Sequence, residues 1–407
     1  MGEWHATMLS EHVRLVKGVS YRKADLLPSS NTKLVNLACV QPGGGFRADR
    51  LKPYAGDFKE DQKLFPGDIA VALTDVTQTG EVVGRPIRIP SNNNTTNVLV
   101  ASLDIAKVAM VTNQVWTRWL YYRLQAPDYT GHVTASTTGT TVRHLSPTDI
   151  LRFVFPLPPF PEQRAIAEVL GALDDKIEAN RRVIDLLESL ISARWEDVSS
   201  DSSGWLQQPI SEVAKIVGGS TPRTSVTDFW NGSISWATPK DLSRLTSTPL
   251  FRTERTITEQ GLQQISSGLL PRGTVLLSSR APIGYLAIAE VPLAINQGFI
   301  ALNSLGVVPN LYLWQWVAHH MAEIKDRANG TTFQEISKAN FRSIEFDIPP
   351  AEVIDRWMNE AEPLYQLVVK LENETSILAN LRDMLLPKLM SGELRVRDAE
   401  PVVEDAL

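Results

Sequence analysis

The chain has 407 residues, of which 43% are hydrophobic and 21% charged, and its 40 Lys and Arg against 46 Asp and Glu give a formal net charge of −6. No run of about 18 apolar residues is present, and the first ten residues form neither a basic nor an apolar segment, so we expect no membrane span, no secretory signal and a cytoplasmic location. The single cysteine, Cys39, excludes an internal disulfide and a cysteine-based zinc cluster. The length predicts two or three domains, and the net acidity taken alone argues against a nucleic-acid partner.

Residues 1–160 are predicted to form a β-rich domain. Residues 34–37 and 68–73 are apolar runs bounded by turn-forming residues, which is typical of strands. Residues 65–68, Phe-Pro-Gly-Asp, predict the turn from which the second of these strands begins.

An internal repeat follows. Residues 138–159 align without a gap on residues 329–350, and seven of these positions are identical. The repeat ends each time in a Pro-Pro pair, at Pro158-Pro159 and at Pro349-Pro350. A constant offset over such a stretch indicates a duplicated structural unit rather than two unrelated amphipathic segments.

Beyond each Pro-Pro pair, apolar residues recur at alternating steps of three and four, as in helices that pair as a coiled coil. The prolines mark the helix starts, because proline is tolerated in the first turn of a helix but not in its interior. Each seam contains one polar residue, which can fix the register of the pair at some cost in stability. The predicted seam residues are Ile166, Leu170, Leu173, Ile177, Asn180, Ile184, Leu187 and Ile191 in the first helix, and Trp357, Ala361, Leu364, Val368, Leu371, Thr375 and Leu378 in the second.

The second half of the chain repeats the β-rich pattern. Residues 274–277 and 286–289 predict strands, and residues 270–273, Leu-Pro-Arg-Gly, are the expected counterpart of residues 65–68. We therefore predict an α+β protein with a first domain over 1–160, a helix over 161–200, a second domain over 201–349, a helix over 350–395 and an acidic tail over 396–407.

The charge is unevenly distributed along this chain. Residues 1–160 contain 17 basic and 13 acidic residues, and residues 201–350 contain 12 of each. Residues 161–200 contain 5 basic against 9 acidic residues, and residues 351–407 contain 6 against 12. The acidity belongs to the helices and the tail, so the neutral to basic β-rich domains remain able to bind nucleic acid.

The motifs of common catalytic sites are absent. The chain has no phosphate-binding loop, no His-Glu-x-x-His and no Gly-x-Gly-x-x-Gly after a strand, and its six histidines lack the spacing of metal ligands. Residues 157–160, Leu-Pro-Pro-Phe, are similar to a loop of amino-group methyltransferases, but Leu157 cannot accept a hydrogen bond from a target amine. We expect no metal site and no catalysis by this chain alone.

Four segments resemble the specificity subunit of type I restriction-modification enzymes. They are residues 157–167 (LPPFPEQRAIA) with 170–177 (LGALDDKI), residues 219–222 (GSTP) with 230–236 (WNGSISW), and the ending at residues 385–394 (LLPKLMSGEL). Two departures stand out: the first domain lacks the Gly-x-Thr-Pro signature, and Pro350 is not followed by Glu-Gln-Arg.

This resemblance implies a non-catalytic DNA-binding protein. Each β-rich domain would be a target recognition domain that reads one half of a split double-stranded DNA target. The two helices would pair antiparallel, with a pseudo-two-fold repeat, as a spacer and as docking sites for two methyltransferase subunits, which restriction subunits join. S-adenosylmethionine, ATP and magnesium would then bind to the partners and no cofactor to this chain. A helix over residues 161–197 would be roughly 55 Å long, which suits half-sites more than one DNA turn apart.

DNA readout uses Arg or Lys for guanine, Asn or Gln for adenine, and hydroxyl groups for phosphates. The candidate residues are Arg22, Lys23, Gln41, Arg47 and Arg50 in the first domain and Thr221, Arg223, Lys240, Arg280 and Gln297 in the second. The Gly-Thr-Thr repeat adds Thr140, Thr141, Thr331 and Thr332, which either contact phosphate or form a shared structural turn. Trp230 and Trp236 are predicted to lie in the core rather than to stack on bases.

A different class of function is also compatible with the pattern. A coiled-coil scaffold whose β-rich domains bind proteins would have the same helices and the same repeat. The two hypotheses differ in one property, because phosphate contacts make DNA binding decline steeply with salt and a protein-binding scaffold has no such contacts.

Overall fold

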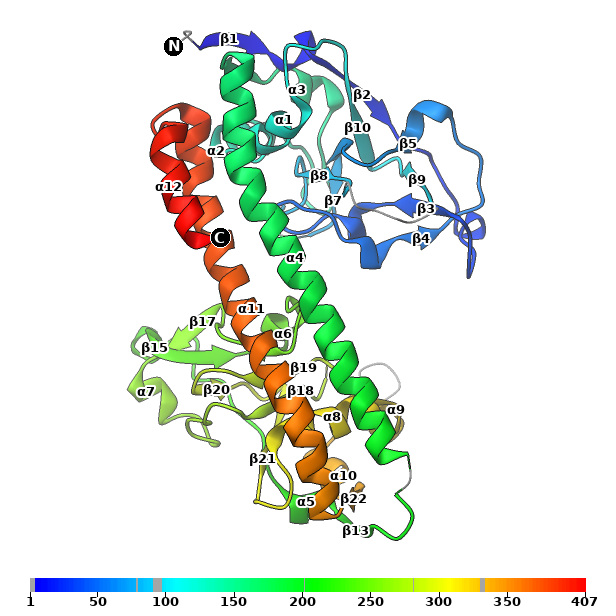
Figure 1. The fold of residues 1–407 in the computed structure, drawn as a ribbon, viewed down its shortest axis with the longest axis vertical. Helices are drawn as coiled ribbons and strands as arrows, with labels where there is room; N and C mark the ends of the chain where they lie inside the picture. Colours follow the sequence, from blue (N-terminus) through cyan, green and yellow to red (C-terminus); the bar gives the residue numbers. More distant parts are fainter. Residues whose placement is uncertain (1–3, 78–79, 91–96, 201, 281, 330–333) are drawn as a thin grey trace. The chain divides into compact units, whose positions relative to one another are not determined.

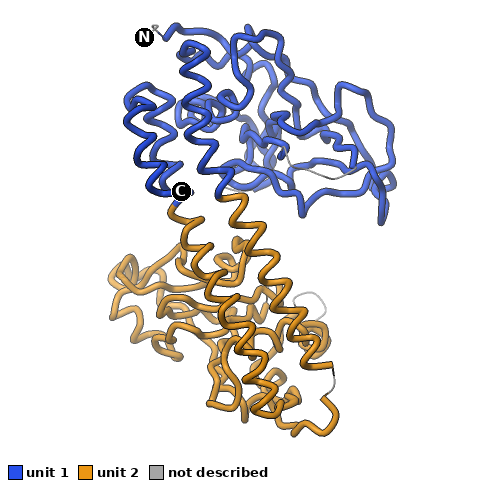
Figure 2. Tube along the Cα trace, in the orientation of Figure 1, with its two compact units in different colours: residues 1–176, 378–407 blue, residues 177–377 orange. Residues whose placement is uncertain are grey.

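The computed structural model describes residues 4–77, 80–90, 97–200, 202–280, 282–329 and 334–407. The chain forms two compact units (Figure 2): unit 1 comprises residues 1–176 and 378–407, and unit 2 comprises residues 177–377. The division falls inside two long helices, α4 (Phe160–Ser199) and α11 (Ala351–Ser391) (Figure 1). Each unit therefore consists of one β-rich domain together with a section of both helices.

Unit 1 contains two four-stranded sheets. The first has the order β2-β10-β6-β8 and is antiparallel throughout; the second has the order β4-β3-β9-β5 and contains the parallel pair β3 and β9. Two short pairs, β1 with β12 and β7 with β11, lie outside these sheets. The strands are β1 (His5–Met8), β2 (Val13–Lys17), β3 (Thr32–Val35), β4 (Lys52–Pro53), β5 (Lys63–Leu64), β6 (Ile69–Ala72), β7 (Thr74–Asp75), β8 (Pro86–Arg88), β9 (Val98–Ala101), β10 (Ile105–Met110), β11 (Arg143–His144) and β12 (Val154–Leu157).

Aliphatic side chains from both sheets pack together in a core of unit 1. Leu99 and Ala101 of β9 pack there with Ile87 of β8 and Ile105 of β10. Cys39 is buried in the same cluster, and burial raises the pKa of its thiol, so it behaves as a small apolar residue. The helices of this unit besides α4 and α11 are α1 (Thr117–Arg123), α2 (Pro127–Ser136), α3 (Pro147–Leu151) and α12 (Val396–Ala406).

Unit 2 repeats this arrangement with different loops. A five-stranded sheet has the order β14-β21-β18-β19-β16, and a three-stranded sheet has the order β17-β15-β20 with β15 parallel to β20. The strands are β13 (Leu206–Pro209), β14 (Ala214–Val217), β15 (Trp230–Ala237), β16 (Pro249–Leu250), β17 (Arg255–Ile257), β18 (Val275–Ser278), β19 (Leu286–Ala289), β20 (Leu293–Ile295), β21 (Phe299–Ser304) and β22 (Glu345–Ile348). The shorter helices are α5 (Ile210–Val213), α6 (Pro239–Ser243), α7 (Glu259–Leu262), α8 (Asn310–His319), α9 (Met321–Asp326) and α10 (Lys338–Arg342).

The two units share a topology that extends well beyond the repeat visible in the sequence. The antiparallel order β2-β10-β6-β8 matches β14-β21-β18-β19, the triple β4-β3-β9 matches β17-β15-β20, and β1 with β12 matches β13 with β22. Gly67 and Gly273 hold the same place in the two units. Both have positive φ angles, of 88° and 86°, and their amides bond Ile89 O at 2.8 Å and Ala289 O at 2.7 Å. The predicted correspondence of residues 65–68 with residues 270–273 is thus present in the backbone.

Within each unit the sections of α4 and α11 lie side by side and antiparallel. In unit 2, Arg194 pairs with Glu360 at 3.2 Å, and further along Glu188 and Glu372 accept hydrogen bonds from the adjacent residues Thr248 and Ser247. In unit 1, Arg382 pairs with Asp174 at 2.8 Å. Since the number on α11 rises as the number on α4 falls, the chain directions are opposed.

Two details differ from the predictions. The strand predicted at residues 34–37 is β3, which ends at Val35 because the side chain of Asn36 accepts a hydrogen bond from Ala38 N and caps a 3₁₀ turn over Leu37–Cys39. The acidic tail at residues 396–407 is largely helical, as α12, and Ala399 and Val403 on one face are buried. The tail is therefore an amphipathic helix, which its acidic composition alone did not indicate.

Candidate nucleic-acid interface

In each unit a glycine begins the first loop, where the backbone packs closely against another strand, β20 in unit 2 and β9 in unit 1. At Gly219, after β14, a side-chain Cβ would overlap Ile295 O, and at Gly18, after β2, it would overlap Ala101 O. The next amide in each unit bonds the same oxygen, Ser220 N at 3.1 Å and Val19 N at 2.8 Å. Gly18 is therefore the structural counterpart of Gly219, although Gly18 is not followed by the Thr-Pro of the family signature.

In unit 2, the candidates of the second domain lie on loops and on the short helix α6, which meet at one edge of the sheets. Hydrogen bonds join the ends of these strands, from Ser220 N to Ile295 O, from Asn296 N to Ala237 O and from Ser279 N to Gly298 O. Thr221 and Arg223 follow β14, Lys240 follows β15, Arg280 follows β18 and Gln297 follows β20. The fold thus brings together residues that are up to 76 positions apart, such as Thr221 and Gln297.

Two of these candidates are bonded to each other. The hydroxyl of Thr221 donates to Gln297 Oε1 at 2.5 Å, and both side chains are exposed. This hydrogen bond engages the amide oxygen of Gln297, and the amide NH₂ group of an exposed glutamine suits the acceptor atoms on the edge of a base.

Lys240 belongs to a cluster of charges that the sequence did not suggest. Lys240 Nζ and Arg244 Nη1 each lie 3.0 Å from Glu254 Oε2. The hydrogen bond from Lys240, with the positive charges of Lys240, Arg244 and Arg255, lowers the pKa of Glu254. Glu254 comes 14 positions after Lys240, and the two meet where β17 pairs with β15. The sequence shows the close basic pairs Lys240 with Arg244 and Arg252 with Arg255, but not that Glu254 joins Lys240 to Arg244.

Asp241 fixes the geometry of this cluster. Its carboxylate accepts hydrogen bonds from Thr238 N at 2.7 Å and from Glu254 N at 2.7 Å, so it joins both ends of the segment that links β15 to β17. Arg255 follows Glu254 in the chain, and its guanidinium carbon lies 3.5 Å from the centre of the Trp230 ring. Trp230 and Trp236 are themselves buried and in edge-to-face contact, as core residues.

Arg280 is half-buried and lies 3.9 Å from Glu335. Arg223 is exposed, and its carbonyl accepts a hydrogen bond from the indole of Trp230. Thr331 and Thr332 lie outside the described residues.

The candidates of the first domain occupy two loops of unit 1. Arg22 and Lys23 are exposed in the loop that follows β2, at the position that Arg223 takes after Gly219. Gln41, Arg47 and Arg50 lie between β3 and β4, where both arginines pair with Asp49, at 3.2 Å and 2.9 Å.

The Gly-Thr-Thr segment of unit 1 forms a turn. Gly139 has a φ of 95°, and Thr138 and His144 pair across the turn through two backbone hydrogen bonds. Thr140 and Thr141 are exposed at its tip. A structural turn accounts for the glycine, and the exposed hydroxyls remain available to a ligand.

Most of the proposed seam residues are buried. Ile166, Leu170, Leu173, Ile177, Asn180, Ile184, Ile191, Trp357, Ala361, Val368, Thr375 and Leu378 are buried, whereas Leu187, Leu364 and Leu371 are half-buried. Counted 14 residues along each helix from the Arg194–Glu360 pair, Asn180 comes opposite residue 374, next to Thr375. Asn180 Nδ2 and Thr375 Oγ1 are both buried without a hydrogen-bond partner.

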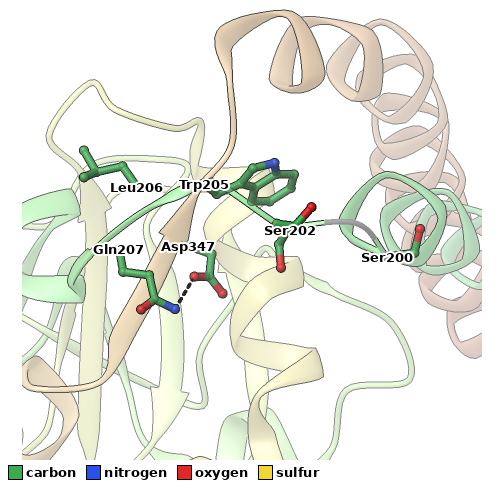
Figure 3. A pocket seen from close by; sticks show the side chains of 8 residues that line it. Ser200, Ser202, Trp205, Leu206, Gln207 and Asp347 are labelled. Carbon is green, nitrogen blue, oxygen red and sulfur yellow. Dashed lines mark hydrogen bonds between the residues drawn. The ribbon is translucent and has the colours of Figure 1, made fainter.

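A hollow in the described part of unit 2 is lined by none of these candidates. It has a volume of about 680 Å³ and is lined by residues 200 and 202–207 and by Asp347. Gln207 Nε2 donates to Asp347 Oδ1 at 2.7 Å at its wall (Figure 3). The hollow follows the end of α4, and no Arg or Lys residue lines it.

Metal-binding clusters and membrane-spanning helices are both absent from the described part of the chain. Within it, no group of three or more His, Cys, Asp or Glu residues is placed to hold a metal ion. In the same residues, no helix is both long and apolar enough to cross a membrane.

Comparisons with known proteins agree with this architecture. Residues 58–189 and 202–361 match the family model described as "Type I restriction modification DNA specificity domain". The chain is 37% identical over 171 residues to the type I restriction enzyme MjaIX specificity subunit of Methanocaldococcus jannaschii, over 40% of each chain. It is 24% identical over 201 residues to the HindI specificity subunit of Haemophilus influenzae, over 47% of this chain and 42% of that protein, so these matches span less than half of either relative.

A solved structure shares the fold over nearly the full length. The S subunit of a type I restriction-modification system from M. genitalium superposes with a TM-score of 0.55 at 15% identity, covering 95% of this chain and 96% of that one. Since the family model matches most of the chain, in two consecutive copies, the chain belongs to the family of type I restriction-modification DNA specificity subunits.

Proposed function

We propose that this chain recognises a bipartite double-stranded DNA target, with one half read by each β-rich domain. The observation that carries the proposal is the duplicated topology with candidate DNA-contacting residues in equivalent loops. Arg22 and Arg223 follow the matching glycines, and cation clusters follow the matching strands β3 and β15. Two domains with the same topology but different loops are suited to recognising two different DNA sequences.

The proposed partner proteins follow from the same family relationship. The paired helices α4 and α11 would dock two methyltransferase subunits, and restriction subunits would join that complex. The chain itself performs no methyl transfer, and S-adenosylmethionine, ATP and magnesium belong to the partners. The acidic sections of the helices support docking by complementary basic surfaces.

Reconstitution tests this function. The purified chain is mixed with its methyltransferase and with genomic DNA, and modified adenines are mapped. We expect methylation at one split sequence only when both proteins are present. Methyl transfer by the chain alone, or methylation without sequence preference in the mixture, would contradict the proposal.

A salt titration separates this function from that of a protein-binding scaffold. Binding of the full chain to a random 30-base-pair duplex is followed by fluorescence anisotropy between about 50 and 200 mM salt. A DNA reader loses affinity steeply over this range because counterions are released from each phosphate it contacts. Absence of salt-dependent binding would favour the scaffold.

A further inference from the structure

Each unit has an exposed carboxylate that bridges two cations. In unit 2, Glu254 lies 3.0 Å from both Lys240 and Arg244, and the three side chains are 47%, 58% and 48% exposed. In unit 1, Asp49 lies 3.2 Å from Arg47 and 2.9 Å from Arg50, and these side chains are also partly or largely exposed. Each cluster therefore has one more positive than negative charge on the surface.

The two clusters occupy the same place in the duplicated fold. The first lies in the connection from β3 to β4, and the second in the connection from β15 to β17. In both units the first strand of the connection pairs in parallel with a third strand, β9 or β20, and the last strand pairs back in antiparallel. The sequences of the two connections are unrelated and their lengths differ, so the shared feature is the arrangement of charge and not an inherited motif.

The surroundings hold the second cluster in position. Asp241 bonds the backbone of Thr238 and of Glu254, and Arg255 adds a further positive charge stacked on Trp230. Asp241 thus anchors the backbone that carries Lys240, Arg244 and Glu254, which reduces the ordering cost of binding an anion.

The carboxylates contribute little to folding. Exposed ion pairs of this kind stabilise a protein only slightly, so an incoming anion can displace the carboxylate at small cost. A phosphate diester offers the cations the same geometry of charged oxygen atoms, and arginine in particular matches it.

We propose that these two clusters are the backbone-phosphate sites of the two DNA half-sites, and that Glu254 and Asp49 are built-in counter-ions that DNA phosphate displaces. This inference rests on the proposed function and adds to it a regulatory role for two acidic residues. In the free protein the carboxylates keep the cations ordered. They also reduce attraction to DNA that does not fit well enough to displace them.

The test removes the counter-ion charges. Full-length chains carrying Glu254→Gln or Asp49→Asn are titrated with a random 30-base-pair duplex at about 100 mM salt. Removing a negative charge beside a bound phosphate should strengthen DNA binding by about 1 kcal/mol. We therefore expect each variant to bind about fivefold more tightly than the wild type. Glu178→Gln and Glu168→Gln are the matched controls, because each removes the same charge from an arginine pair on α4, and we expect wild-type affinity.

A second set of variants removes the cations. The double variant Lys240→Ala, Arg244→Ala should weaken binding and reduce the slope of log affinity against log salt by about 0.9 for each phosphate that the variant no longer neutralises. Melting temperatures within the range of the controls show that the variants are folded.

The outcomes separate the two hypotheses. If the wild-type chain binds DNA with a salt slope but the Glu254 and Asp49 variants match the controls, this inference is wrong and the proposed function stands. If the wild-type chain shows no salt-dependent binding, the proposed function fails and the inference fails with it. Tighter binding by both variants and weaker binding by the double cation variant support the inference.

Discussion

Arg382 of α11 donates a hydrogen bond to Asp174 of α4, with 2.8 Å between Nη1 and Oδ1. The same carboxylate accepts a hydrogen bond from the hydroxyl of Tyr122 on α1 at 2.6 Å. Burial and the nearby charge of Asp174 raise the pKa of Tyr122 well above its ordinary value, so its hydroxyl remains a donor. Asp174 therefore ties three helices of unit 1 together.

Replacing this carboxylate should loosen unit 1. Asp174→Ala leaves Tyr122 and Arg382 without their acceptor, and we expect a loss of about 1 to 3 kcal/mol in the free energy of unfolding, measured by urea titration. Glu168→Ala removes an exposed helix pair with Arg164 and should cost less than about 1 kcal/mol. Equal effects of the two substitutions would show that Asp174 is an ordinary surface residue.

The polar pair in the helix seam should limit stability. Asn180 and Thr375 bury polar atoms without partners, and apolar residues of similar size remove that cost. We expect the double variant Asn180→Leu, Thr375→Val to raise the melting temperature by several degrees, at the cost of a less strictly defined helix register. A lower melting temperature would mean that the two side chains bond each other or an ordered water.

Gly18 and Gly219 should be intolerant of any side chain. An added Cβ would meet backbone oxygen atoms of Ala101 and Ile295, which cannot move without breaking strand pairs. We expect Gly18→Ala and Gly219→Ala each to cost more than about 2 kcal/mol in thermal unfolding. Gly131→Ala is the control, because its Cβ meets no atom and α2 should gain up to about 1 kcal/mol.

Asp75 should make the stability of unit 1 depend on pH. Its buried carboxylate accepts hydrogen bonds from the amides of Thr77, Val82 and Val83. Burial raises the pKa of Asp75, but the hydrogen bond from the Thr77 side chain and those from the three amides outweigh burial, and the pKa is lowered overall. A lowered pKa in the folded state means that the stabilisation is fully present above the unfolded-state pKa of about 4 and is lost as the pH falls through the folded-state value.

The variant Asp75→Asn tests this dependence. At pH 7 it should unfold more readily than the wild type by about 1 to 3 kcal/mol, and the difference should shrink below about pH 4. Hydrogen exchange at the amides of Val82 and Val83 should accelerate at pH 7. A difference that stays constant from pH 7 to pH 3 would argue against an ionised Asp75.

The regular parts of this fold could be predicted from the sequence. Steps of three and four residues after the Pro-Pro pairs indicate the long helices, and the apolar runs at residues 68–73 and 286–289 correspond to β6 and β19. These patterns depend only on neighbours in the chain, which is why a single sequence contains them.

The features that the sequence does not reveal depend on contacts between distant segments. The residues that follow Gly18 and Gly219 differ, and only the approach to Ala101 O and Ile295 O makes the two glycines equivalent. Glu254 meets Lys240, 14 positions earlier, through the pairing of β17 with β15 and the hydrogen bonds of Asp241. Neither relationship has a local signal in the sequence.

The spacing between matching points of the two units has a consequence for how this protein can change over evolutionary time. Gly18 and Gly219 are 201 residues apart and Gly67 and Gly273 are 206 apart, yet the segments before the long helices are 191 apart. Insertions and deletions have thus accumulated in the connections while the sheets kept their order. The loops of one unit can therefore change in length and composition during evolution while its sheets, and the loops of the other unit, stay the same.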